Sequence, residues 1–362
     1  MLNTKLALSL LAAAIIAATV LAILAKKKGS KLLGIICAAV SAFALVIAVA
    51  TVTVSAKGTV IIAKETETAE ATQKEEAEEE ILDSITQEAK LLIEDDLTAA
   101  INFVKASPSG RDDTAPAYEE KTGKYILTEF QKTMYDNMLE KARDFEYFSY
   151  SDQDDEGNAV YNAPIVYATL TKDYPELENY FSIYQATEED KVISAESVYF
   201  MPDDPTLVQA SDMAALKHQA KLFDALCSYV VKSIPDEFCD YDRYRCIAAF
   251  ISLRTENAAG DEWQNRTCYG ALIGGQSDNH GYASAFKYLC MKAGLNCSII
   301  LGNVSANNYY WNTVKLGDKE YHIDLAMADK GSVGDDQWNA YFMADENTIR
   351  SDHFIIDSEA WN

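Results

Sequence analysis

The stretch that decides the fold runs from Cys268 to Cys290 and reads CYGALIGGQSDNHGYASAFKYLC. Its first half is rich in glycine and its second half in apolar residues, so a glycine-rich loop is predicted to open a helix near Asn279. Three short apolar segments follow, SIILG at 298–302, YYWNTV at 309–314 and YHID at 321–324. These segments predict a helix followed by three strands.

This text resembles the transglutaminase-like family of the papain-type cysteine enzymes. Members carry a Cys-x-Gly-Tyr-Ala helix start, a His-Ala-Trp-Asn strand and an aromatic-x-x-Asp strand, which match Asn279 to Ala283, Tyr309 to Asn312 and Tyr321 to Asp324. The resemblance is close over 237–329 and looser over 125–362. It implies an α+β domain of papain-like topology, with helices packed on an antiparallel sheet. The closing residues also look like those of bacterial members, namely Tyr341-Phe342-Met343, Asp345 and Asp352-His353.

The resemblance implies three catalytic positions, and two of them are replaced. Asn279 stands where the family has its nucleophilic cysteine, Tyr309 stands where it has its histidine, and Asp324 keeps the aspartate that orients that histidine. An amide is no nucleophile of this kind, and a phenol of pKa about 10 is a poor general base. We therefore expect a pseudoenzyme in which Asn279 caps the helix, Tyr309 donates its hydroxyl to Asp324, and Asp324 has nothing to orient.

Four neighbouring side chains are candidates to line a ligand groove: His280, Tyr310, Trp311 and Cys268. For each a plainer role is open, a solvated side chain for His280, core packing for the two aromatic residues and a buried thiol for Cys268. The alternative function is an active thiol or carboxylate hydrolase with relocated residues, which would use Cys268, Asp278 or Asp324. His353 is expected to have a structural role at the end of the domain.

The charge of the chain excludes one class of partner. The net charge is −25, and residues 1–63 hold six of the 31 basic residues and no acidic one, which leaves 31 − 6 = 25 basic against 56 acidic residues in the rest. Such a surface repels phosphate backbones, so we expect no nucleic-acid binding. The cysteine spacings match no zinc pattern, so no metal and no cofactor are expected; buried free thiols are favoured, and any disulfide pairing stays open.

Two uncharged apolar stretches, 6–25 and 32–54, each have the length that a membrane-spanning helix needs. They predict a transmembrane hairpin over 1–56, with the basic loop 26–31 in the cytoplasm and the C-terminal domain outside it, in a multi-pass protein of the cell membrane. An acidic helical stalk and linker is predicted over 57–124.

The domain at 125–362 is predicted to contain helices at 125–145 and 213–233, strands at 165–170 and 192–200, and a helical piece near 175–184. From all these features we expect a catalytically inactive surface domain that binds a peptide, a cell-wall ligand or a partner protein. A purely structural, membrane-anchored interaction scaffold is the second alternative.

Overall fold

The structure is a computed structural model, and it describes residues 87, 89–116, 123–151, 161–188, 191–209, 211–258 and 262–355. The chain divides into two compact units, Met1–Ile81 and Leu82–Asn362. All the described residues belong to the second unit.

The predicted membrane hairpin needs a correction. No helix among the described residues is both long and apolar enough to cross a membrane. The longest one that is fully described, α6 (Met213–Ser233), has 21 residues but carries several charged side chains, Lys217, Lys221, Asp224 and Lys232. The predicted spans 6–25 and 32–54 lie outside the described residues, so the transmembrane hairpin is not supported. The multi-pass membrane localisation that depended on it is therefore withdrawn.

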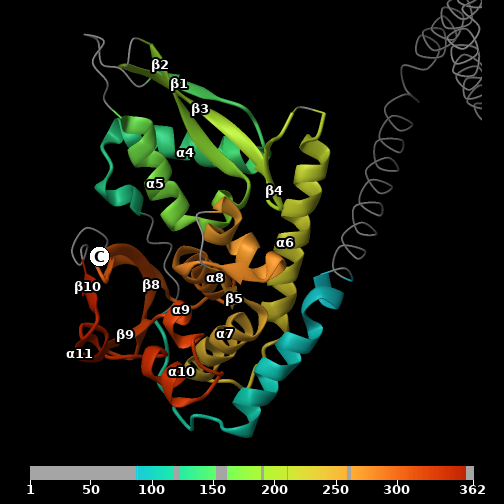
Figure 1. The fold of residues 1–362 in the computed structure, drawn as a ribbon, viewed down its shortest axis with the longest axis vertical. Helices are drawn as coiled ribbons and strands as arrows, with labels where there is room; N and C mark the ends of the chain where they lie inside the picture. The colour runs from blue at the N-terminus through green and yellow to red at the C-terminus, as the bar shows by residue number, and fades with distance from the viewer. Residues whose placement is uncertain are drawn as a thin grey trace, which may run out of the picture. The chain divides into compact units, whose positions relative to one another are not determined.

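The remaining part of the fold prediction, an α+β domain with antiparallel sheets, agrees with the structure. The main sheet has the strand order β10-β7-β8-β9, and all its neighbours are antiparallel. Helix α8 packs against β8, as Figure 1 shows, and the Asn312 side chain ties them together by donating to the Ala283 carbonyl at 2.9 Å. The bounds are α8 Asn279–Lys292, β7 Ser298–Val304, β8 Asn307–Leu316, β9 Lys319–Ile323 and β10 His353–Ile355.

Three further helices surround α8 in the larger hydrophobic core, namely α6, α7 (Asp240–Arg254) and the helix at 89–106. The helix at 89–106 buries one stripe at helical spacing, made of Ala89, Ile93, Leu97, Ala100 and Val104. It therefore belongs to the packed core, within the segment predicted as an acidic helical stalk and linker.

Short elements complete this part of the fold: η3 Trp263–Arg266, η4 Gly270–Gly274, α9 Leu325–Ala328, α10 Asp336–Tyr341, α11 Glu346–Ile349, and the parallel pair β5 Glu256–Asn257 and β6 Gln276–Ser277. The helices α9, α10 and α11 each begin after an aspartate whose carboxylate accepts a backbone N–H of the first turn, Asp324, Asp335 and Asp345 respectively. Such caps satisfy donors that a helix leaves unpaired and so fix where each short helix starts.

A second hydrophobic core lies between another four-stranded antiparallel sheet and two helices. Its elements are η1 Gly123–Ile126, α4 Glu129–Asp144, β1 Ser149–Ser151, α5 Asn162–Asp173, η2 Pro175–Asn179, β2 Phe181–Glu188, β3 Lys191–Met201 and β4 Asp204–Leu207. The predicted strand at 165–170 is wrong, because these residues lie within α5. A run of six apolar residues is too short to distinguish the periodicity of a helix from that of a strand. The buried residues Ala163, Val166 and Leu170 follow the helical periodicity.

Candidate functional site

The N-terminus of α8 differs from the prediction in one residue. Asp278, not Asn279, is the N-cap, because its carboxylate accepts the N–H groups of His280 at 2.9 Å and Gly281 at 3.0 Å. Asn279 instead reaches across to β8, where its Oδ1 accepts the Tyr310 N–H at 2.9 Å. The pairing of β8 with β9 ends at Asn312, so the Tyr310 N–H lies beyond it, and the amide supplies the acceptor.

Tyr309 and Asp324 come together at the ends of β8 and β9. The Tyr309 hydroxyl donates to Asp324 Oδ1 at 3.3 Å, and the Met327 N–H donates to the same oxygen at 3.0 Å. Asp324 is completely buried. Burial raises the pKa of the Tyr309 hydroxyl far above its ordinary value, and the Asp324 charge and hydrogen bond raise it further. Tyr309 therefore acts as a hydrogen-bond donor and not as a base.

Asp324 also has a histidine partner, against the prediction that it would have nothing to orient. His353 on β10 places its Nε2 at 2.9 Å from Asp324 Oδ2 and its Nδ1 at 2.6 Å from Asp352 Oδ1. Burial lowers the pKa of His353, but its hydrogen bonds and charge interactions with Asp324 and Asp352 outweigh that and raise it. Both ring nitrogens face carboxylates, so neither is free to accept a proton from a substrate.

This contact joins residues that the sequence separates widely. The Tyr341 hydroxyl donates to Asp352 Oδ2 at 2.5 Å, so a chain of hydrogen bonds runs from Tyr341 through Asp352, His353 and Asp324 to Tyr309. The resemblance of Asp352-His353 to bacterial family members was the one sequence signal that pointed here.

Two predicted groove residues are buried instead. Trp311 is 1% exposed, and its Nε1 donates to His322 Nδ1 at 3.0 Å. Cys268 is fully buried, and burial holds the pKa of its thiol well above the ordinary range. A thiol in that state supplies almost no thiolate, so Cys268 does not qualify as a relocated nucleophile.

The other two predicted groove residues, His280 and Tyr310, do come together. Their ring centroids lie 4.4 Å apart, and His280 Nε2 lies 3.6 Å from Glu178 Oε2 of η2. The opposite nitrogen, His280 Nδ1, is buried without a hydrogen-bond partner. Glu178 belongs to the part of the chain with the second core, so this site joins both cores, and sequence spacing did not indicate it.

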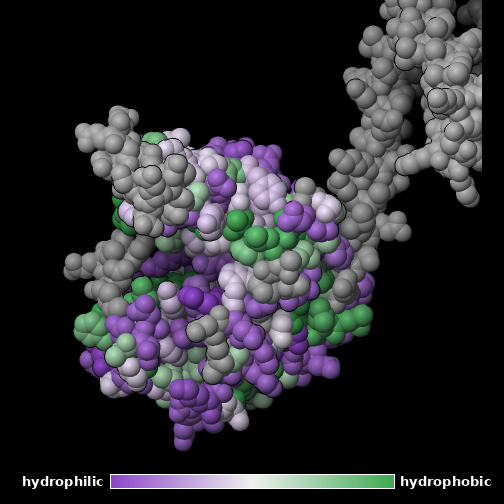
Figure 2. All heavy atoms as spheres, turned by 45° about the horizontal axis from the view of Figure 1, so that its top comes forward, coloured by the Kyte–Doolittle hydropathy of each residue, from purple (hydrophilic) through white to green (hydrophobic). Residues whose placement is uncertain are grey.

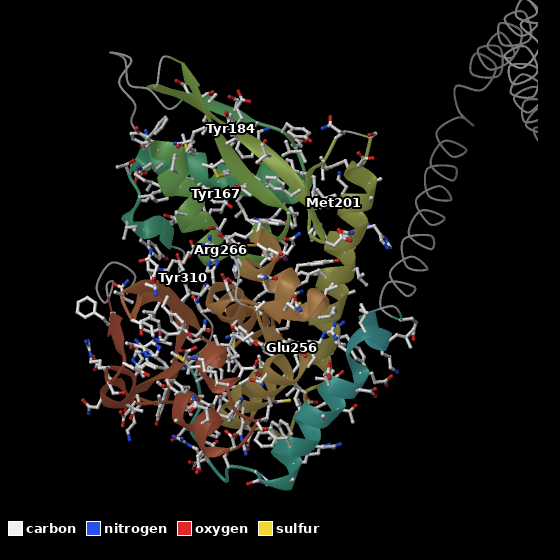
Figure 3. The ribbon with its side chains drawn as sticks, in the orientation of Figure 1. Tyr167, Tyr184, Met201, Glu256, Arg266 and Tyr310 are labelled. Atoms are coloured by element: carbon white, nitrogen blue, oxygen red, sulfur yellow. The ribbon has the colours of Figure 1, made fainter. Side chains whose placement is uncertain are left out.

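Arg266 completes this site beside the α8 N-terminus. Its Nε lies 3.9 Å from Asp278 Oδ2, and its side chain stays 51% exposed. Figure 3 shows Arg266 between Tyr167 and Tyr310, and its charge acts on both phenols.

The face of the molecule in Figure 2 is largely hydrophilic and hollowed. Among the described residues, no group of three or more His, Cys, Asp or Glu side chains is placed to hold a metal ion.

Comparisons with known proteins add little. No protein-family model matches the chain, and no curated protein matches it. A solved structure described as "Crystal structure of a TGase" matches at 10% identity and a TM-score of 0.25, over 50% of this chain and 50% of its own. The chain thus spans about half the length of that structure. A likeness at this TM-score establishes neither the fold nor the activity of this chain.

Proposed function

We propose that this chain is a binding protein on a transglutaminase-like fold in which the family's acyl-transfer chemistry does not operate. The observation that carries the proposal is that the residues at the three family positions are engaged in structural hydrogen bonds. Asn279 bonds the β8 backbone, Tyr309 bonds Asp324, and Asp324 also pairs with His353.

Acyl transfer of this kind needs a nucleophile and a base with a free nitrogen. Asn279 offers neither a thiol nor a hydroxyl, and the two nitrogens of His353 already face Asp324 and Asp352. The nearest upstream thiol, Cys268, is buried. Fold and catalysis separate easily, so a domain that lacks these groups still offers a surface for binding.

The surface beside the α8 N-terminus suits a peptide better than a cell-wall ligand or a large partner. Tyr310 and His280 offer partly exposed rings for apolar side chains, while Arg266 and Glu178 offer opposite charges close by. A peptide carries apolar groups, donors and acceptors at short intervals, which is what this mixture recognises. Peptides selected on the full chain by phage display should bind less well to Tyr310→Ala and equally well to Tyr184→Ala, a matched change of an exposed tyrosine on β2.

The proposed absence of acyl-transfer activity, the chemical half of the proposal, is tested separately. The full chain should show no deamidation, cross-linking or proteolysis of glutamine-containing peptides. In the double variant Asn279→Cys with Tyr309→His, the new thiol lies at a helix N-terminus and the imidazole beside Asp324, so iodoacetamide should alkylate it faster than a thiol of pKa about 8.5. The single variant Asn279→Cys is the control and should react more slowly.

Two results would contradict this half. Wild-type turnover that disappears in Cys268→Ser or Asp324→Asn would establish relocated chemistry. An introduced thiol that stays unreactive in the folded double variant would show that the matched positions do not form a family site.

One observation favours the alternative of a hydrolase with relocated residues. His280 has a carboxylate beside Nε2, the pairing that orients a general base, but its unpaired Nδ1 is buried and would have to become exposed for a substrate to reach it. Hydrolysis of an ester or peptide probe that is lost in both His280→Gln and Glu178→Gln would select this alternative.

A further inference from the structure

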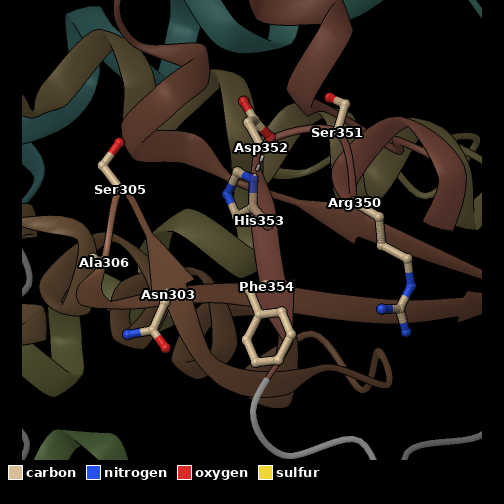
Figure 4. Close-up of a pocket in the computed structure, with 8 residues that line it drawn as sticks. All are labelled: Asn303, Ser305, Ala306, Arg350, Ser351, Asp352, His353 and Phe354. Carbon is tan, nitrogen blue, oxygen red and sulfur yellow. Dashed lines mark hydrogen bonds and ion pairs between the residues drawn. The ribbon is translucent and has the colours of Figure 1, made fainter.

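A hollow of about 550 Å³ with mixed polar and apolar walls lies at the β10 edge of the sheet, beside the β7–β8 turn and the segment that joins α11 to β10 (Figure 4). Its lining residues are Asn303, Ser305, Ala306, Arg350, Ser351, Asp352, His353 and Phe354. Ser305 and Ala306 both have left-handed backbone angles, φ 52° and 66°, as a tight two-residue hairpin turn requires. One wall of the hollow is therefore a fixed turn.

Asp352 gives the hollow a rigid hydrogen-bond acceptor. Its side chain is 36% exposed, while His353 holds Oδ1 at 2.6 Å and Tyr341 holds Oδ2 at 2.5 Å. His353 is in turn held by the buried Asp324. Each carboxylate oxygen has two lone pairs, so each keeps one for a ligand hydroxyl after these contacts. A binding group held by buried neighbours in this way loses little freedom when a ligand arrives.

Arg350 gives the hollow a positioned donor. Its Nε and Nη2 both lie 2.8 Å from Glu346 Oε1, and this pair leaves Nη1 on the open side of the guanidinium. The hydroxyls of Ser305 and Ser351 add groups that both donate and accept. The hollow thus offers both hydrogen-bond donors and acceptors.

Phe354 adds an exposed aromatic face. The residue is 67% exposed and stands directly opposite Asn303 across the β10–β7 pair, so both side chains lie on the same face of the sheet. A phenyl ring exposed beside the Asn303 amide offers one apolar surface with a polar edge. A pyranose ring has the complementary form, because its C–H groups form apolar patches and its hydroxyls surround them.

The charges around the hollow disfavour an anionic ligand. Glu346 neutralises Arg350, and His353 lies between two carboxylates, Asp324 and Asp352. One negative charge is therefore left over beside the hollow. We propose that this hollow is a binding site for a neutral saccharide, stacked on Phe354 and hydrogen-bonded to Asp352 and Arg350. It is separate from the proposed peptide site at His280 and Tyr310 and does not depend on it.

The test is a glycan array probed with the full chain, followed by calorimetric titration with the oligosaccharide bound best, or with chitotriose, maltotriose and cellotriose if none stands out. Phe354→Ala and Asp352→Asn should each weaken binding about tenfold or more, because each removes one of the main contacts. Tyr184→Ala changes an equally exposed aromatic residue on another sheet and should leave the affinity unchanged. Tyr310→Ala should also leave it unchanged, which separates this site from the peptide site.

Three outcomes would overturn the proposal. The first is that no array glycan and no soluble trisaccharide binds the folded chain. The second is a saccharide affinity that Phe354→Ala and Asp352→Asn both leave intact. The third is a loss of binding in Tyr310→Ala alone, which would place the saccharide at the other site. Because Phe354 is mostly exposed, its replacement is expected to leave the fold intact, and circular dichroism of the variant checks this.

Discussion

Replacing His353 by glutamine tests whether the buried histidine is a charged structural element. The wild-type imidazolium makes one contact with the fully buried Asp324 and one with Asp352, which is 36% exposed. Breaking a buried ion pair by removing one partner costs about 3–5 kcal/mol. The contact with the exposed carboxylate adds little, because solvent screens it. We therefore expect His353→Gln to lower the free energy of unfolding by about 3 kcal/mol at slightly acid pH.

The pH dependence gives the sign of the effect. The folded-state pKa of His353 is raised above its ordinary value of 6.5, so its contribution to stability is complete below pH 6.5 and is lost as the pH rises through the raised pKa. The difference in stability between wild type and His353→Gln should therefore shrink as the pH rises above 6.5 and through the raised pKa of His353. Neighbouring Tyr341 does not titrate in this window, because its pKa is raised to about 12 by its hydrogen bond to Asp352 and by burial.

Urea unfolding followed by fluorescence at a series of pH values measures both quantities. His218→Gln is the matched control, since His218 is exposed on α6 and its replacement should change stability little at any pH. If the stability of His353→Gln matched that of the wild type below pH 6.5, or if their difference did not shrink as the pH rose above that value, the assignment of a buried imidazolium would be refuted.

Three further predictions probe the packing of the larger core. Ser284→Ala should stabilise the protein by about 1 kcal/mol in a urea titration, since it removes a fully buried hydroxyl that has no partner; a clear loss would reveal a hidden partner. Gly281→Ala should lower the free energy of unfolding by about 3 kcal/mol in the same assay, because the new Cβ would lie 2.6 Å from the Asn265 carbonyl oxygen. Gly274→Ala is the control and should lower it far less, because the nearest atom to its Cβ would be 4.0 Å away. Of the six described cysteines, Cys239 should be alkylated first by iodoacetamide in the native protein, as peptide mapping will show, because the other five are buried; earlier labelling of any of those would contradict the packing.

Local sequence patterns predicted the elements whose ends are marked by capping or turn residues. The helix predicted at 213–233 is α6 with the same bounds, and the predicted strand 192–200 lies within β3. The glycine-rich loop before Asn279, with Asn279 taken as the cap, indicated the start of α8 to within one residue. The prediction of a strand at 165–170 was wrong because a short apolar segment is compatible with a helix or a strand. Only its packing against neighbouring elements determines which of the two forms.

The sequence by itself therefore determined the α+β class and the order helix, strand, strand, strand. That Asn279 and Tyr309 replace two catalytic positions of a family stays a prediction from the resemblance. Only the tertiary structure decided what Asp324 contacts. His353 contacts Asp324 because β10 pairs antiparallel with β7. A strand of three residues is too short for its pattern of polar and apolar residues to indicate which strand it pairs with. The pairing of Glu178 with His280 likewise depends on how η2 packs against α8. The pattern of polar and apolar residues along the chain does not specify which elements contact each other.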